Sequence, residues 1–281
     1  ALFLGLALGM TAGQPFPKFS KKTSKYLLQF SVVGLGFGMN LHESLRTGKE
    51  GMLFTVVSVV AVLALGMYLG KRLMMDRKTA YLISAGTAIC GGSAIAAVAP
   101  VVKANDNEMS MSLGTIFILN AIALFIFPPI GHLLGMSQEQ FGMWAAIAIH
   151  DTSSVVGAGA AYGEQALEIA TMVKLTRALW IIPVTIATMF IFKQKGAKIS
   201  IPWFIFFFIL AMVANTFLTI PETITGSLVW LAKKGLTVTL FLIGAGLSRK
   251  VIKQVGVRPM VQGVVLWIFI GLISLGVIML V

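Results

Sequence analysis

Two short segments of this chain resemble each other, and each interrupts a long apolar run with small polar residues. Ala88–Ile95 reads Ala-Ile-Cys-Gly-Gly-Ser-Ala-Ile, and Ala148–Val155 reads Ala-Ile-His-Asp-Thr-Ser-Ser-Val. Inside a bilayer, the backbone groups that such a break frees are tolerated only where they are buried in protein or line a cavity. Breaks at corresponding positions of two related segments are the best sequence pointer to a transporter's binding site.

The composition is that of a polytopic membrane protein. Of the 281 residues, 57% are hydrophobic and 11% are charged, and the mean hydropathy is +0.91. A soluble domain has about 25% charged residues, and a spanning helix needs about 20 apolar residues. We therefore predict an all-α protein with about ten membrane segments. The uninterrupted runs cover about 1–13, 26–41, 51–70, 109–131, 169–192, 201–219, 228–247 and 259–281, and the interrupted runs cover about 80–103 and 141–163.

The net charge of +12 is concentrated in short loops between apolar runs. This pattern indicates cytoplasmic loops of a membrane protein and no nucleic-acid partner. The basic loops hold Lys18, Lys21 and Lys22; Lys71, Arg72, Arg77 and Lys78; Lys193, Lys195 and Lys198; and Arg249, Lys250, Lys253 and Arg258. The chain opens inside an apolar run, so we expect a further helix upstream of it.

Several functional classes are excluded by missing motifs. The lone Cys90 excludes an internal disulfide and a cysteine-based metal site. The sequence has no phosphate-binding Gly-Lys-Ser/Thr loop, no His-Glu-x-x-His pattern and no credible Gly-x-Ser-x-Gly elbow. We therefore expect no enzyme, no cofactor and no metal, and any transport would draw on an ion gradient.

An internal repeat relates the two halves of the chain. Gly36–Met39 aligns with Gly244–Leu247 at the ends of the chain, and the two interrupted segments align inside it. The basic loops place the starts of the outer units on opposite sides of the membrane, which makes the repeats inverted. The repeat units are about 1–70 against 201–281 and, inside them, about 80–131 against 141–192.

From this repeat we predict a single transmembrane transporter domain over 1–281. Its scaffold would cover about 1–75 and 200–281, and its transport core about 76–199. The two interrupted runs are either re-entrant hairpins or broken helices that cross the membrane. Each limb has about 11–13 residues, roughly 17–20 Å of helix, so in both arrangements the breaks lie near the midplane. Inverted symmetry favours the hairpins, while the nearly neutral flanking loops do not discriminate.

The residues at the breaks are typical of helix starts. Gly91 and Gly92 permit unusual backbone conformations, and Ser93 can cap the helix that follows. At the second break, Asp151 and its neighbours are all good N-cap residues. Two helix N-termini would then present free N–H groups to an anion. Glycine kinks filled by neighbouring side chains are the structural alternative. The predicted substrate-binding residues at the breaks are Cys90, Gly91, Gly92, Ser93, Asp151, Thr152, Ser153 and Ser154.

Four ionisable residues lie inside apolar runs, where they are costly and usually functional. His150 and Asp151 are candidates for proton or ion coupling, because histidine titrates near neutral pH; the alternative is a capping Asp151 and a hydrogen-bonded core His150. Lys174 and Arg177 share one helix face and could add positive charge to the substrate site. The alternative for these two is that they snorkel outward.

Three stretches resemble a known family. Gly86–Pro100, Ile149–Thr152 and Val173–Arg177 are similar to the conserved hypothetical bacterial membrane family that is often labelled sulfate exporter. The resemblance runs over nearly the whole chain. It implies a secondary transporter of the inner membrane, within the cation/proton antiporter and anion transporter superfamily, with inverted repeats and unwound helices at its substrate site.

The function that these observations favour is secondary active transport of a small anion, such as sulfate, a sulfonate or a carboxylate, coupled to a proton or sodium gradient. One alternative is a sodium/proton antiporter in which Asp151 binds the cation. Another is a membrane sensor or assembly subunit without flux. The expected partners are the anion, the coupling ion and the lipid bilayer, and the sequence leaves a homodimer open.

Overall fold

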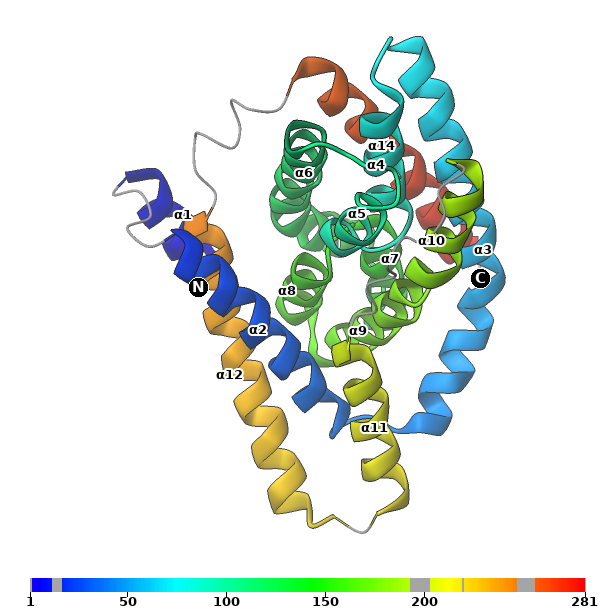
Figure 1. The fold of residues 1–281 in the computed structure, drawn as a ribbon. Helices are drawn as coiled ribbons and strands as arrows, with labels where there is room; N and C mark the ends of the chain where they lie inside the picture. The colour runs from blue at the N-terminus through cyan, green and yellow to red at the C-terminus, as the bar shows by residue number, and fades with distance from the viewer. Residues whose placement is uncertain (1, 12–16, 193–202, 219, 247–255, 281) are drawn as a thin grey trace. The chain divides into compact units, whose positions relative to one another are not determined.

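The computed structural model describes residues 2–11, 17–192, 203–218, 220–246 and 256–280, and within them every regular element is an α-helix (Figure 1). The predicted all-α class is therefore confirmed. Two of the predicted basic loops lie largely outside the described residues. Their residues there are Lys193, Lys195, Lys198, Arg249, Lys250 and Lys253. The helices are α1 (Leu2–Thr11), α2 (Pro17–Gly36), α3 (Leu41–Arg72), α4 (Arg77–Ala88), α5 (Gly92–Val98), α6 (Asp106–Leu133), α7 (Gln138–Ala148), α8 (Thr152–Tyr162), α9 (Glu164–Ala178), α10 (Ile181–Ile191), α11 (Trp203–Phe217), α12 (Glu222–Gly246) and α14 (Val257–Leu280).

Among the described residues, four helical stretches are long and apolar enough to cross a membrane. These are Phe54–Arg72, Asp106–Leu133, Glu164–Ile191 and Val257–Leu280. They establish a multi-pass membrane protein, and the larger number of about ten segments stays a prediction.

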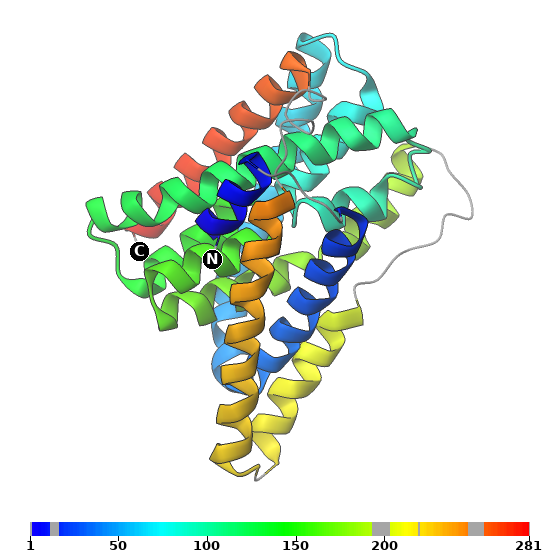
Figure 2. The same ribbon diagram turned by 90° about the vertical axis from the view of Figure 1, so that its left-hand side faces the viewer.

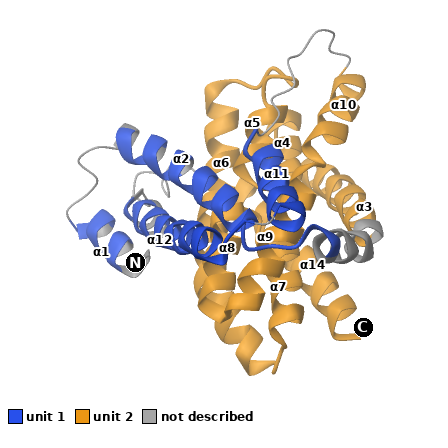
Figure 3. Ribbon diagram, turned by 90° about the horizontal axis from the view of Figure 1, so that it is seen from below, with its two compact units in different colours: residues 1–49, 202–251 blue, residues 50–201, 252–281 orange. Residues whose placement is uncertain are grey.

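The chain forms two compact units, coloured separately in Figure 3. The smaller unit consists of residues 1–49 and 202–251, and the larger unit of residues 50–201 and 252–281. These boundaries differ from those predicted for scaffold and core, because 50–75 and 252–281 group with both interrupted segments. The predicted scaffold and core are parts that would move relative to each other during transport. This division therefore stays a prediction.

In the smaller unit, α12 packs against α1 and α2, and α2 also packs against α11. Figure 2 shows α2, α11 and α12 side by side. The contact between α1 and α12 is close enough to require glycine, since a Cβ at Gly5 would overlap the carbonyl oxygen of Phe241. Small residues permit such close packing between membrane helices.

In the larger unit, side-chain hydrogen bonds connect α14 with α3 and with a helix of each interrupted segment. The Gln262 Nε2 of α14 donates to the carbonyl oxygens of Gly66 (2.8 Å) and Ala80 (3.0 Å), which joins α14 to α3 and α4. The Trp144 Nε1 of α7 donates to the Gly271 carbonyl oxygen at 3.0 Å. Both contacts satisfy polar groups that would otherwise be buried without a partner.

Each interrupted segment doubles back on itself. At the outer end of the first segment, the Lys78 Nζ in α4 donates to the Lys103 carbonyl oxygen beyond α5, at 2.8 Å. At the outer end of the second, the Tyr162 hydroxyl at the end of α8 donates to the Met136 carbonyl oxygen before α7, at 2.6 Å. Because the start and end of each segment lie together, each segment folds as a hairpin of two short helices. This favours the re-entrant arrangement over crossing broken helices, and the course of both segments through a membrane stays a prediction.

The predicted helix boundaries need correction where charged residues extend a helix. Lys18, Lys21 and Lys22, expected in a loop, lie in α2, and the polar stretch 42–50 lies in α3. Lysine, arginine and glutamate have high helix propensity, so the apolar runs underestimate the helices. The predicted run 169–192 is instead split between α9 and α10. Pro183 explains this split, because proline has no N–H to donate and clashes with the carbonyl four residues earlier.

Candidate functional site

The first break separates α4 from α5 through a glycine. Helix α4 ends at Ala88, and Gly91 has a φ of +64°, a left-handed conformation that favours glycine. Helix α5 then starts at Gly92, and no side chain caps its N-terminus. Cys90 is buried with a free thiol, whereas Ser93 is exposed. The break therefore combines a buried turn with an accessible helix start.

The second break separates α7 from α8 through an acidic cap. Ile149 is extended, with φ −87° and ψ 126°. The Asp151 Oδ2 accepts from the backbone N–H of Ser153 (3.1 Å) and Ser154 (3.4 Å), and also from the Ser153 hydroxyl. Thr152, Ser153 and Ser154 are buried, and Asp151 is partly exposed. Here the helix N-terminus already carries a carboxylate from the chain itself, which its positive end stabilises.

The two breaks touch each other. A Cβ at Gly91 would lie 3.4 Å from both the N and the Cα of Asp151. Figure 1 shows α5, α7, α8 and α9 gathered in the middle of the larger unit. The predicted meeting of the two interruptions is therefore confirmed. The alternative of glycine kinks filled by neighbouring side chains stays open, since a Cβ at Gly91 would also lie 3.2 Å from the Ile116 Cγ2.

Lys174 joins the ends of the two half-helices that precede the breaks. It lies near the middle of the Glu164–Ile191 stretch and is 0% exposed. Its Nζ donates to the Ile89 carbonyl oxygen at 3.1 Å, and to those of Ala146 and Ile149 at 3.2 and 2.7 Å. An ammonium group has three donors, and these three carbonyls use all of them.

Arg177 lies one helical turn further along α9 and binds beside the first break. It is 1% exposed. Its Nη2 donates to the Ala88 carbonyl oxygen at 2.6 Å, and its Nη1 donates to the Ser58 hydroxyl of α3 at 3.2 Å. Its Nε is buried without a partner among the described residues. The alternative that Lys174 and Arg177 snorkel outward is therefore wrong.

The two cations sit where helices expose unpaired carbonyl groups. The last carbonyls of a helix lack intrahelical partners and carry about half a negative charge. Lys174 and Arg177 satisfy those of α4 and α7 in an interior that water does not reach. Their predicted contact with a substrate stays a prediction; the contacts described are to the protein's own backbone and to Ser58.

His150 and Asn120 are two further polar residues at the second break. The Asn120 Oδ1 accepts from the backbone N–H of His150 (3.0 Å) and of Asp151 (3.2 Å). His150 is 0% exposed. Both of its ring nitrogens and the Asn120 Nδ2 lack partners among the described residues. The alternative of a hydrogen-bonded core histidine is therefore wrong for the imidazole, and its coupling role stays a prediction.

One residue with a part in the site is not found by sequence reasoning. Ser58 lies in an apolar run that also holds Thr55, and hydroxyl groups in such runs usually indicate packing between helices. Its partner Arg177 lies far away in sequence, so local patterns do not identify it. Asn120 is a weaker candidate from the sequence, for which a structural hydrogen bond is the expected role, and its bonds from the His150 and Asp151 N–H groups confirm that role.

Comparisons with known proteins give a consistent result. A family model described as Conserved hypothetical protein 698 matches residues 1–263. The chain is 66% identical over 281 residues to a UPF0324 membrane protein of Bacteroides thetaiotaomicron, covering 99% of this chain and 85% of that protein. It is 57% identical over 286 residues to a UPF0324 membrane protein of Porphyromonas gingivalis, covering 100% of this chain and 86% of that protein. No solved structure matches.

Proposed function

This chain belongs to the membrane protein family described as Conserved hypothetical protein 698, and we propose that it is a secondary transporter of a small anion. The observation that carries the proposal is the contact between the breaks at Gly91 and Asp151, with buried Lys174 and Arg177 beside them. Interrupted backbone and buried cations are both costly in lipid, and both mark substrate pathways.

The contacts at the ends of the larger unit support an inverted arrangement. Phe192, beyond α10, meets Arg77 at the start of α4, with the guanidinium carbon 5.0 Å from the ring centroid. At the start of α9, the Gln165 N–H donates to the Gln138 Oε1 at the start of α7, at 3.0 Å. The outer ends of the two hairpins therefore lie at opposite ends of the α9–α10 stretch, as inverted repeats in the bilayer require.

The charge balance favours an anion. Lys174 and Arg177 contribute two positive charges and Asp151 one negative charge. The partial charges of the helix starts and ends around the breaks roughly cancel, since each is about half a unit and the signs alternate. With Lys174, Arg177 and Asp151 all ionised, one net positive charge remains for an occupant to neutralise. Sulfate, a sulfonate or a carboxylate fits this requirement, and Ser93, which is exposed at the first break, gives it a point of access.

Coupling would involve His150 and Asp151, which flank the same contact. His150 has two unpartnered ring nitrogens, and one proton converts its acceptor into a second donor. In this proposal the protein lies in the bacterial inner membrane, and a proton or sodium gradient drives the anion. The predicted transport core, about 76–199, would move relative to the predicted scaffold and so open the site to each side of the membrane in turn.

The test is a thermal-shift screen of the purified full-length protein with sodium and chloride held constant, against sulfate, ethanesulfonate and acetate. Ser93→Asp places a carboxylate at the accessible first break, where it would repel the anion. Ser110→Asp is the matched control, because Ser110 is also exposed but lies in α6 away from both breaks.

We expect one of these anions to raise the Tm of the native protein and of Ser110→Asp, but not of Ser93→Asp. The same anion should enter proteoliposomes that contain the native protein. In a second screen, with chloride held constant and sodium varied, stabilisation by sodium with proton release and no response to the anions would overturn the anion proposal in favour of a cation antiporter. If no ion binds to the protein and none crosses the membrane through it, the result would indicate a sensor or assembly subunit.

A further inference from the structure

A groove of about 470 Å³ opens at the basic end of the larger unit. It lies where the apolar stretch of α3 ends at Arg72 and α4 begins at Arg77. Its lining includes Met67, Tyr68, Met75, Ala80, Lys71 and Arg77. The end of a membrane-spanning stretch lies at the level of the lipid headgroups, so this groove combines an apolar wall with a cationic rim at that depth.

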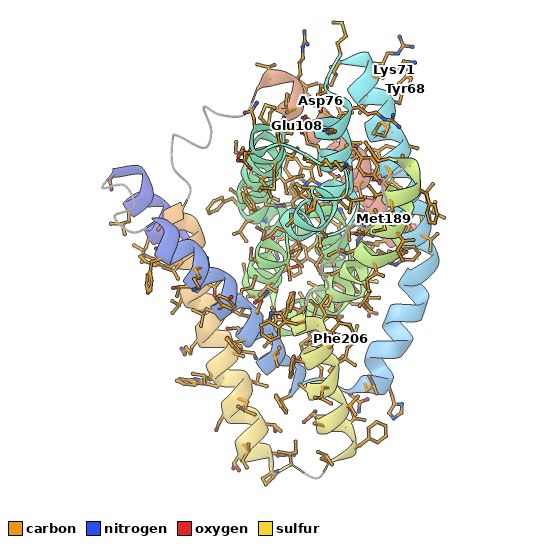
Figure 4. All side chains as sticks on the ribbon, viewed as in Figure 1. Tyr68, Lys71, Asp76, Glu108, Met189 and Phe206 are labelled. Carbon is orange, nitrogen blue, oxygen red and sulfur yellow. The ribbon has the colours of Figure 1, made fainter. Side chains whose placement is uncertain are left out.

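The three basic residues at this end differ in how firmly they are held, and of them Lys71 and Arg77 line the groove whereas Arg72 does not. The Arg72 Nε donates to the Tyr68 hydroxyl at 3.1 Å, which directs its guanidinium toward that ring. Arg77 lies over the Phe192 ring, 5.0 Å from its centroid. Lys71 is exposed and has no partner among the described residues. Figure 4 shows Lys71 and Tyr68 at the same end of the larger unit as Asp76 and Glu108.

The nearby carboxylates are already occupied by helix starts. The Asp76 Oδ2 accepts from the N–H groups of Lys78 (2.9 Å) and Thr79 (3.0 Å). The Glu108 Oε2 accepts from the Asn105 N–H at 2.7 Å, in a capping box. Neither makes an ion pair with Lys71 or Arg77 among the described residues, so the groove keeps its positive charge for an outside ligand.

We propose that this groove binds the headgroup of an anionic phospholipid. Lys71 and Arg77 contact the phosphate oxygens, and the wall formed by Met67, Tyr68 and Met75 accepts the glycerol and the first acyl carbons. Basic pockets between membrane helices on the cytoplasmic side bind anionic headgroups in this way. The apolar wall distinguishes a lipid from a free anion, which would gain nothing from it.

Native mass spectrometry of the detergent-purified full-length protein tests the proposal. The protein is titrated with phosphatidylglycerol, with phosphatidylcholine of the same acyl chains, and with inorganic phosphate as a competitor. The variants are Lys71→Gln and Arg77→Gln. Lys103→Gln is the matched control, since Lys103 is exposed and basic and its side chain is not part of the groove.

We expect phosphatidylglycerol to bind more tightly than phosphatidylcholine, and Lys71→Gln and Arg77→Gln each to weaken it about fivefold. Lys103→Gln should leave the affinity unchanged, and millimolar phosphate should not displace the lipid. Equal binding of the two lipids, an equal loss in Lys103→Gln, or displacement by phosphate alone would each overturn the proposal. None of these outcomes depends on what the breaks transport.

Discussion

The two breaks have the same position in their hairpins but opposite chemistry. The first turns through Gly91 in a left-handed conformation, leaves the start of α5 without a side-chain cap and exposes Ser93. The second is closed by Asp151, held by Asn120 and lined by buried hydroxyl groups. The second break already contains its own carboxylate, whereas the first does not.

This difference suggests a division of roles. At the second break the backbone N–H groups are already bonded, those of Ser153 and Ser154 to Asp151 and those of His150 and Asp151 to Asn120, and these bonds hold the backbone in a fixed geometry. At the first break the chain supplies no anion, so an external one can take the position that the Asp151 carboxylate occupies at the second. Lys174, bonded to Ile89 on one side and to Ile149 on the other, keeps the two together.

The largest expected effect comes from removing that link. Lys174→Met keeps an unbranched side chain that ends one atom short of the ammonium nitrogen, and leaves three buried carbonyl oxygens without their donor. Losing one partner of a buried charged contact costs about 3 kcal/mol or more. The Tm should therefore fall by about 6–12 °C for a chain of this size.

The control is Lys78→Met, which removes a single bond to the Lys103 carbonyl oxygen at a more exposed position. Thermal unfolding in detergent, followed by tryptophan fluorescence, measures both variants. Similar losses in the two would contradict the structural role assigned to Lys174.

A smaller loss of thermal stability is expected from a substitution that tests the contact between the breaks separately from backbone strain. Gly91→Ala adds a Cβ in a left-handed conformation, 3.2 Å from the Ile116 Cγ2 and 3.4 Å from Asp151. Gly135→Ala is the control for a Cβ at positive φ, because Gly135 has a φ of +63° and nothing within 4 Å of its Cβ position. Strain alone costs about 1 kcal/mol, so the Tm should fall further in Gly91→Ala. Equal shifts in thermal unfolding would mean that the two breaks are not in contact.

The third effect concerns how the second break is held. Asn120→Ala removes the acceptor that binds the N–H groups of His150 and Asp151, which should destabilise the protein by about 1–2 kcal/mol. Asn107→Ala, at an exposed position of α6, should change the Tm little. Hydrogen exchange should then rise at His150 and Asp151 and stay constant at Gly91. Faster exchange at both breaks would show that they are not independent.

The smallest effect on stability carries the most functional information. Asp151→Asn keeps an N-cap acceptor, as does Asp76→Asn at the start of α4, so each should cost less than about 1 kcal/mol. With the carboxylate gone, the anion at the first break should bind more tightly. A titration of the anion by thermal shift measures this change. Weaker anion binding in Asp151→Asn, with Asp76→Asn unchanged, would contradict the division of roles.

The sequence predicts the positions of the breaks because their chemistry is local. Gly91 and Asp151 act within a few residues of themselves, one by its backbone freedom and the other by capping the next turn. The sequence leaves the burial of Lys174 and Arg177 open, because the same spacing allows both to snorkel outward, and the structure decides for burial. Local patterns therefore identify most residues of the candidate site, but not the burial of these two.

The remaining features depend on contacts between distant segments. The preference for hairpins over crossing helices follows from Lys78 meeting Lys103, and the flanking loops carry no charge signal for it. The carbonyls bound by Lys174 come from two other helices, and Ser58 comes from a third. Helix lengths were underestimated at α2 and α3, because charged residues continue a helix beyond its apolar part.

The most direct test of the central claim is an anomalous diffraction map of the protein crystallised with selenate, a heavier analogue of sulfate. The account predicts one selenium peak beside the first break, within hydrogen-bonding reach of Ser93, and no peak where the Asp151 carboxylate already lies. A map with selenium only at the second break or elsewhere, or with no peak at saturating selenate, would contradict it.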